Sequence, residues 1–206
     1  GMTLTSPTHP TADSWSKQGT IVVAWTHKEG AVYSYAMGTD IAAVPDDAPE
    51  TAIGEKRYEQ FSDGVYYFTI KERPADGAWS AVTQRRFLVD STPPEQFVIT
   101  KLDPKTVGGA ALIGWAAHDV TSFIASYALT ANGQRIENVA SPLALQPSWR
   151  GKTLTITAHD QAGNTRSASW KYPASSPFSL PLRDRVWLFV GILAGAAILT
   201  ALAMMV

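Results

Sequence analysis

Short runs of alternating apolar and polar residues fill the chain between Gly19 and Tyr172, and glycine, proline, aspartate and asparagine separate the runs. Alternation with a period of two is typical of β-strands that bury one face, whereas no segment in this region keeps a helical period long enough to predict a helix. The expected inward-facing side chains of the first half are Ile21, Val23, Trp25, Tyr33, Tyr35, Met37, Tyr66, Phe68, Ile70, Phe87 and Val89. This pattern predicts an all-β fold.

The second half of this region repeats the order of the first. The matching pairs are 21–25 (IVVAW) with 111–115 (ALIGW), 34–37 (SYAM) with 126–129 (SYAL), and 69–70 (TI) with 155–156 (TI). In both halves a glycine, Gly77 or Gly163, follows the isoleucine of the last pair. A fixed order with loops of varying length indicates domain duplication, and about seven strands per copy suit a β-sandwich.

Two proline-containing segments divide the chain. The paired prolines of 90–94 (DSTPP) stiffen the join between the copies and cannot donate ladder hydrogen bonds, so we expect two domains that stand end to end. A second linker, rich in proline and serine, covers 174–185. The predicted organisation is a first sandwich at 1–92, a second at 93–173, this linker, and a final apolar segment at 186–206.

The apolar segment 186–206 (VWLFVGILAGAAILTALAMMV) carries no charge. A helix of this length rises by about 1.5 Å per residue and spans roughly 32 Å, close to the hydrocarbon thickness of a bilayer. Trp187 follows Arg183 and Arg185 closely, where an interfacial aromatic residue belongs. We therefore predict a single transmembrane helix, because the alternative, a buried core helix, rarely runs this long without a polar stripe.

The orientation of this helix and its association are separate questions. Arg183 and Arg185 precede the helix and would by themselves place its N-terminal side in the cytoplasm, so an external position of the β domains requires a basic tail beyond the sequence given. A cleaved lipid-anchor signal is the alternative, because small residues precede a spacer and an apolar tail. Gly191 and Gly195 have the GxxxG spacing of a weak helix-mediated dimer.

Composition narrows the function classes. Apolar residues make up 45% of the chain, charged residues 17%, and the net charge is −1, which excludes a broad basic field for nucleic acid. The chain has no cysteine and therefore no disulfide or thiolate site. Gly1 and Met2 lead into polar residues without an export signal, so we expect a piece of a longer protein whose signal lies upstream.

In the first unit, the segments 44–50 (VPDDAPE), 61–68 (FSDGVYYF) and 90–94 (DSTPP) resemble fibronectin-type-III-like modules of bacterial surface proteins. In the second, the segment 156–164 (ITAHDQAGN) is similar to the last hairpin of bacterial Ig-like repeats, where an apolar strand is often followed by D-x-A-G-N. The first unit departs from the D-x-A-G-N hairpin and has 73–77 (RPADG) instead. The resemblance implies tandem Ig-like or fibronectin-type-III-like sandwiches that serve as spacers, adhesive surfaces or enzyme accessories, and it identifies no ligand.

The search for catalytic chemistry yields no template, so we predict no enzyme, no catalytic residue and no cofactor. The four histidines, His9, His27, His118 and His159, lack zinc-site spacing and are interpreted as surface residues. Asp119 and Asp160, each after a histidine, are expected to cap turns. Calcium could use Asp160, Asn164 and loop carbonyls, with Asp90 from the domain join, but turn formation is the preferred interpretation and no metal site is predicted.

Other polar and aromatic groups have surface interpretations. Asp46, Asp47 and Glu50 form an acidic cluster that we expect to be solvated. Trp25 and Trp115 fall within strand patterns and should lie in the cores. The tryptophans near turns, which are the candidates for a glycan or protein partner unless they pack under loops, are Trp15, Trp79 and Trp149.

Together these features predict a non-catalytic, single-pass membrane protein segment with extracytoplasmic β domains, acting as a stalk or as an adhesion or interaction module. The alternative is a carbohydrate-binding accessory region of a surface hydrolase whose catalytic domain lies upstream. A third hypothesis, a receptor ectodomain, requires a cytoplasmic domain after Val206. The expected partners are the membrane and a protein or glycan at the cell surface, and not nucleic acid.

Overall fold

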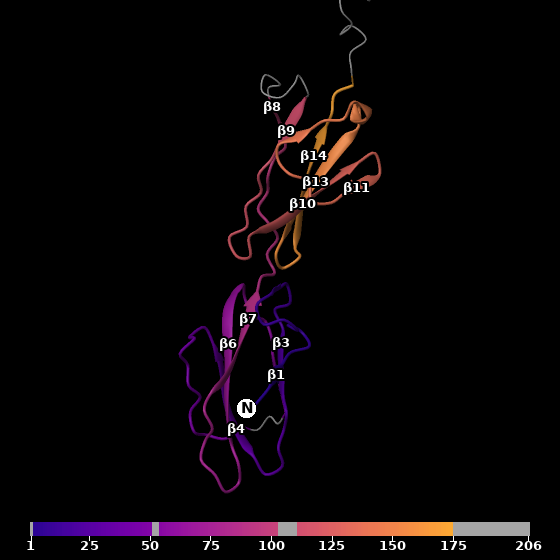
Figure 1. Cartoon of the computed structure of the whole chain (residues 1–206). Coiled ribbons are helices and arrows are strands. Elements are labelled where there is room, and N and C mark those ends of the chain that lie inside the picture. Colours follow the sequence, from indigo (N-terminus) through magenta and orange to yellow (C-terminus); the bar gives the residue numbers. More distant parts are fainter. Residues whose placement is uncertain (1, 51–53, 103–110, 175–206) are drawn as a thin grey trace, which may run out of the picture.

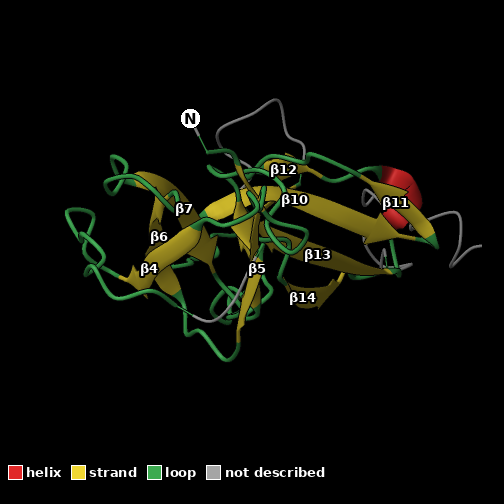
Figure 2. Ribbon diagram, turned by 90° about the horizontal axis from the view of Figure 1, so that it is seen from below, coloured by secondary structure: helices red, strands yellow, loops and turns green. Residues whose placement is uncertain are grey.

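The computed structural model describes residues 2–50, 54–102 and 111–174, and these residues form an all-β structure. Figure 2 shows strands and loops almost throughout, with one short 3₁₀ helix, η2 (Pro147–Trp149), in the part of the chain that is described. The expectation of an all-β fold is therefore confirmed for these residues. The predicted transmembrane segment 186–206 lies outside them, and no helix within the described ranges is long and apolar enough to cross a membrane.

The first unit contains two facing sheets. One sheet has the order β1-β3-β5 and the other the order β2-β7-β6-β4. All neighbours pair antiparallel except β2 and β7, which pair in parallel. The strands are β1 (Leu4–Thr5), β2 (Trp15–Ser16), β3 (Ile21–Trp25), β4 (Val32–Gly38), β5 (Glu55–Tyr58), β6 (Gly64–Arg73) and β7 (Thr83–Val89).

Among the described residues, the second unit has the same plan as the first except at the two edges of its four-stranded sheet. Its sheets have the orders β12-β9-β8 and β11-β10-β13-β14, and all pairs are antiparallel. The strands are β8 (Thr100–Leu102), β9 (Leu112–Gly114), β10 (Ile124–Ala131), β11 (Gln134–Ile136), β12 (Leu143–Ala144), β13 (Thr153–Asp160) and β14 (Thr165–Lys171). The three-stranded sheets β1-β3-β5 and β8-β9-β12 occupy equivalent places in the two units and face four-stranded sheets, the arrangement of Ig-like and fibronectin-type-III-like domains.

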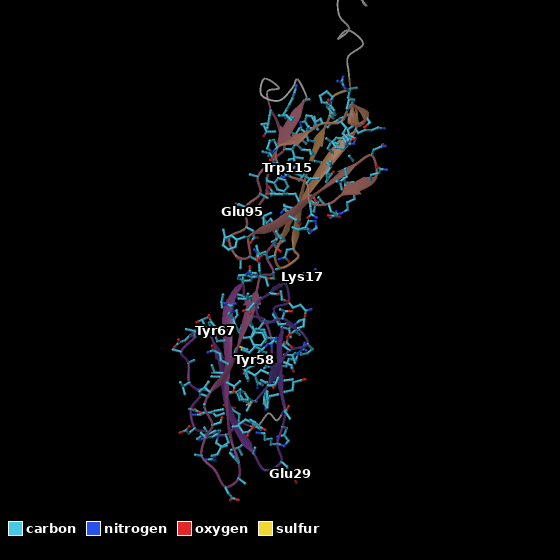
Figure 3. The ribbon with its side chains drawn as sticks, in the orientation of Figure 1. Lys17, Glu29, Tyr58, Tyr67, Glu95 and Trp115 are labelled. Atoms are coloured by element: carbon cyan, nitrogen blue, oxygen red, sulfur yellow. The ribbon has the colours of Figure 1, made fainter. Side chains whose placement is uncertain are left out.

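Each unit encloses a hydrophobic core of its own. In the first, Trp25 packs against Phe68 and Tyr35, with ring centroids 5.9 and 5.5 Å apart. In the second, Trp115 meets Tyr127 edge to face at 5.8 Å beside the fully buried Ile156. Figure 3 shows Trp115 directed into the second unit. The sequence prediction that Trp25 and Trp115 lie in the cores is confirmed.

The register between the two units differs from the sequence alignment at one strand. Ile70 and Ile156 correspond, and their partners across the sheet are Tyr35 and Leu129. Tyr127 therefore corresponds to Tyr33 rather than to Tyr35, and the alignment of 34–37 with 126–129 was wrong by two residues. A shift of two leaves the same faces inward, so an alternating pattern cannot detect it.

A shared hydrogen bond supports this corrected register. The hydroxyl of Tyr33 accepts the backbone N–H of Lys28 at 2.9 Å, and the hydroxyl of Tyr127 accepts the backbone N–H of Ala117 at 3.0 Å. The tyrosine reaches from β4 in the first unit, and from β10 in the second, to the loop that follows the core tryptophan. The two tyrosines therefore fulfil the same role in the two copies.

The units stand end to end, with the chain passing from β7 through an extended segment to β8 (Figure 1). Figure 3 shows Glu29 at the far end of the first unit, whereas Lys17 and Glu95 lie near the junction. This is the arrangement that the proline-containing join predicted. The chemistry of interest is concentrated at this junction, where polar residues from both units meet.

Candidate functional site at the domain junction

The first unit holds the linker through Asp63, which lies in the loop before β6. Its Oδ1 atom accepts hydrogen bonds from the Ser91 backbone N–H at 2.7 Å and from the Ser91 hydroxyl at 2.9 Å, and Oδ2 accepts the Thr92 hydroxyl. Partial burial alone would raise the pKa of Asp63, but these hydrogen bonds outweigh it and lower the pKa. Asp90 is held to the same unit, because its backbone N–H donates to Ser16 O at 2.9 Å.

The second unit holds the same linker from the other side. The Asn164 side-chain amide donates to the carbonyl oxygens of Asp90 at 2.8 Å and Thr92 at 3.4 Å, and Arg166 Nε donates to Pro94 O at 2.9 Å. Linker carbonyls that would otherwise be solvated thus have protein partners. The linker is a hydrogen-bonded connection between two domains rather than a free tether.

Three aspartates converge at this junction. Asp90 follows β7, Asp119 lies in the loop between β9 and β10, and Asp160 is the last residue of β13. One carboxylate oxygen from each lies within 4.8 Å of the others, and the residues are only 0%, 4% and 3% exposed. The first unit therefore contributes one buried carboxylate and the second contributes two.

The two aspartates of the second unit also shape their own loops. Asp119 Oδ1 accepts the backbone N–H groups of Thr121, Ser122 and Phe123 at 3.1, 2.8 and 3.1 Å. Asp160 accepts the Asn164 backbone N–H on Oδ1 at 2.8 Å and the Asn164 amide on Oδ2 at 2.9 Å. The sequence interpretation of these aspartates as turn caps is confirmed.

Asp90 is different, because one of its carboxylate oxygens has no partner. Oδ1 accepts the Thr92 backbone N–H at 3.1 Å, whereas the buried Oδ2 accepts no hydrogen bond. The buried Ser122 hydroxyl lies close enough to act on this carboxylate as a weak donor, but the contact is too poorly aligned for a full hydrogen bond. Burial raises the pKa of Asp90, and the charges of Asp119 and Asp160 add to the rise, against the opposing Thr92 N–H and Ser122 hydroxyl.

Three residues that the sequence analysis named together as possible calcium ligands do meet at the junction, although turn formation was the preferred interpretation there. They are Asp90, Asp160 and Asn164, but the Asn164 amide clamps the linker through its nitrogen, and the Asp160 carbonyl accepts the Gly163 N–H at 3.4 Å. Asp119 was not considered for this site. The only signal was the repeated His-Asp dipeptide at 118–119 and 159–160, which could not show that the two loops meet.

The turn tryptophans lie in three different environments. Trp149 is 8% exposed and belongs to the second core, so packing under a loop, and not a partner surface, accounts for it. Trp15 is partly buried in β2, opposite Leu88 of β7. Trp79 remains partly exposed, with the Lys71 ammonium 5.3 Å and the Arg73 guanidinium 4.9 Å from its ring centre.

One histidine is not at the surface, contrary to the prediction. His9 is 2% exposed, meets Phe87 edge to face at 5.4 Å, and its Nδ1 is 3.0 Å from the Thr8 hydroxyl. Its neighbour Arg85 donates to the carbonyl oxygens of His9 and Leu4. The N-terminal segment crosses the sandwich here, a long-range contact that local pattern does not reveal.

The burial of His9 predicts a pH dependence. Burial, together with the charge of Arg85, lowers the pKa of His9 below its ordinary value of 6.5. The unfolded chain then binds protons more readily, so the first domain should be fully stable above pH 6.5 and should lose stability as the pH falls from 6.5 toward the folded-state pKa. Urea unfolding at pH 7.5 and pH 5.5 measures the loss.

The matched control is His9→Phe, which keeps a ring against Phe87 and cannot titrate. Its midpoint should fall less than that of the unmodified chain over the same pH interval. An equal fall in both proteins would show that other groups, and not His9, cause the pH dependence.

The acidic cluster of the first unit behaves largely as expected. Asp46, Asp47 and Glu50 are exposed. Asp47 pairs with the ammonium of Lys71, whose side chain is only 9% exposed, and the Asp46 carbonyl accepts the Ser34 hydroxyl. The cluster is therefore solvated but also fixes the loop that carries it to β4 and β6.

The charged residues that line a surface hollow in the first unit already have partners. Arg86 pairs with Asp13, and Arg85 is committed to backbone carbonyls, as described above. Tyr67, whose position Figure 3 shows, lines the same hollow. The charged groups there stabilise the fold, and their geometry assembles no nucleophile and base.

Comparisons with known proteins found similar solved structures but no similar sequence. No family model matches the chain, and no curated protein sequence matches it. A structure of Clostridium thermocellum CbhA fibronectin(III)-like modules is 18% identical, with 84% of this chain and 95% of that chain covered and a TM-score of 0.41. The amphioxus IgVJ-C2 molecule is 16% identical, with 77% and 99% covered and a TM-score of 0.39.

A third neighbour comprises the FN1–FN3 domains of chicken CNTN1. It is 14% identical, and the match covers 78% of this chain and has a TM-score of 0.34. The match spans 65% of the chicken chain, just under two thirds of its length. The assignment of both units to the Ig-like or fibronectin-type-III-like class rests on their strand orders.

Proposed function

We propose that this chain is a non-catalytic, membrane-anchored extracytoplasmic spacer that holds a further domain or a contact surface away from the membrane. The observation that carries the proposal is the end-to-end arrangement of two sandwiches with separate cores (Figure 1). A spacer needs length and stiffness, and it needs no reacting groups.

The junction supports the requirement for stiffness. Asp63 from one side and Asn164 and Arg166 from the other together bind the linker between residues 91 and 94 and the carbonyl of Asp90. Two domains joined by a short, hydrogen-bonded, proline-containing segment keep a narrower range of angles than two domains on a glycine-rich tether. The apolar segment 186–206 supplies the proposed anchor.

The second candidate is a carbohydrate-binding accessory region of a larger hydrolase. Trp79 favours it, because this ring remains partly exposed beside Lys71 and Arg73. Both cations lie over or near the ring, however, and such a contact also stabilises the turn after β6 without any ligand. The spacer proposal therefore stands first.

The anchor is tested by expressing the chain with and without residues 186–206, downstream of an export signal, and fractionating the cells. The full chain should stay in the membrane pellet after alkaline carbonate extraction, and the shortened chain should be released. Protease added to intact cells should digest both β domains. Release of the full chain by carbonate, or protection of its β domains from external protease, would contradict the proposal.

A further inference from the structure

Three buried carboxylates at one place need a compensating positive charge. Asp90, Asp119 and Asp160 are each less than 5% exposed, and the charges that act on Asp90 come from the other two aspartates rather than from any lysine or arginine. Buried carboxylates in folded proteins are paired with cations, protonated or bound to metal. The cluster as described contains the anions without their counterpart.

A second observation points into the same space. The Oδ2 atom of Asp90 and the hydroxyl of Ser122 are buried oxygens, and neither makes a well-aligned hydrogen bond. The Ser122 hydroxyl acts on the Asp90 carboxylate only through a poorly aligned contact. Both residues are 0% exposed. Native proteins rarely leave such atoms unsatisfied, and a bound water or ion is one of the standard explanations when a buried atom lacks a protein partner. The unsatisfied oxygens are therefore a second reason, separate from the negative charge of the cluster, to expect a ligand at this place.

From this geometry we infer that the domain junction is a calcium site, formed by the carboxylates of Asp90, Asp119 and Asp160 with the hydroxyl of Ser122. Calcium prefers six to eight oxygen ligands in a flexible arrangement, and carboxylates, a hydroxyl and water provide such a set. Magnesium fits less well, because it dehydrates reluctantly and demands near-ideal octahedral geometry.

The ion would connect the two domains. Asp90 is fixed to the first unit by its N–H bond to Ser16 O, whereas Asp119, in a loop, and Asp160, at the end of β13, belong to the second. Binding would therefore add a cross-link between units beside the hydrogen bonds of Asn164 and would remove the repulsion among three carboxylates. Calcium thus stabilises the junction and the sandwich loops that supply its ligands. This inference is independent of the proposed anchor and is tested on purified protein.

The experiment compares thermal unfolding of the full chain in mild detergent at pH 7.5, in EGTA, in 10 mM calcium chloride and in 10 mM magnesium chloride. Calcium should raise the midpoint of the unmodified chain by roughly 5–10 °C, as expected for a site with a Kd of about 0.1–1 mM. Isothermal titration with calcium chloride should show one site per chain. Magnesium should give less than half of the calcium shift.

Asp90→Asn is the decisive variant. Asparagine keeps an oxygen for the Thr92 N–H, and its amide can donate to Asp119 or Asp160 at the position of the unpartnered oxygen. In EGTA this variant should be as stable as the unmodified chain or more stable, whereas its calcium affinity should fall at least about tenfold. When calcium is added, the unfolding midpoint of the unmodified chain should rise above that of Asp90→Asn.

The matched control is Asp63→Asn, which changes a carboxylate at the same junction but outside the cluster. Its starting midpoint should be lower, and its calcium shift should equal that of the unmodified chain. The inference is overturned if calcium produces no shift in the unmodified chain, if Asp90→Asn responds as the unmodified chain does, or if magnesium acts as strongly as calcium.

Discussion

Replacing Phe68 by alanine should unfold the first domain at far lower denaturant concentration and leave the second domain almost unchanged. Phe68 is fully buried on β6 and packs against Trp25 and Tyr35, with ring centroids 5.9 and 5.6 Å away. Truncation of a buried phenylalanine removes its apolar area and leaves a cavity, which costs about 3–5 kcal/mol. Tryptophan fluorescence and hydrogen exchange, resolved by domain, measure the loss.

The mirror variant is Leu154→Ala in the second domain. Leu154 is fully buried on β13, two residues before Ile156, as Phe68 stands two residues before Ile70. This change should lower the free energy of unfolding of the second domain by about 2–5 kcal/mol and leave the first nearly unaffected. If either variant destabilised both domains equally, the two cores would form one cooperative unit.

Removing the Asp119 side chain should produce the second large effect. Asp119 Oδ1 accepts three backbone N–H groups, and one of these, from Ser122, is buried. Asp119→Ala leaves these donors without their acceptor, and we expect a loss of about 2–4 kcal/mol in the stability of the second domain, because hydrogen bonds to charged groups contribute most. Urea unfolding in EGTA measures this loss without any contribution from calcium.

The variant Asp119→Asn distinguishes the hydrogen bonds that the Asp119 oxygen accepts from the contribution of its negative charge. Asparagine retains an oxygen for the three N–H groups, so in EGTA its stability should lie well above that of Asp119→Ala. It removes one of the proposed calcium ligands, however, and should weaken the response to calcium. Equal losses in the two variants would show that the negative charge, and not the acceptor, stabilises the loop.

The fold was largely predictable because strand patterns are local. Alternation placed Ile21, Val23 and Trp25 in the first core and Trp115 in the second, as the structure confirms. Turn chemistry was predictable at the hairpin after β13, because Gly163 has a φ of 86°, which glycine adopts without steric strain. The hairpin between β10 and β11 turns at Asn132 and Gly133, both with positive φ, and the Asn-Gly pair is itself a sequence signal for such a turn.

Long-range contacts were harder to predict than strands. His9 was expected at the surface, yet it is buried, because the N-terminal segment that carries it packs against β7 and the His9 carbonyl accepts a hydrogen bond from Arg85. Trp149 was a candidate for a partner surface, but the 3₁₀ helix η2 directs it into the second core. In both cases residues distant in sequence decide the burial, and no local period records such contacts.

The sequence by itself determined the strand content, the duplication, the proline-containing join and the apolar C-terminal segment, because each depends on neighbouring residues or on composition. Only the tertiary structure decided the register of Tyr33 against Tyr127, since a shift of two residues preserves every inward face. It also brought Asp90, Asp119 and Asp160 within 4.8 Å of one another. The carboxylates come from the domain join, a loop and the end of a strand, and a cluster of this kind exists only after both sandwiches have folded and met.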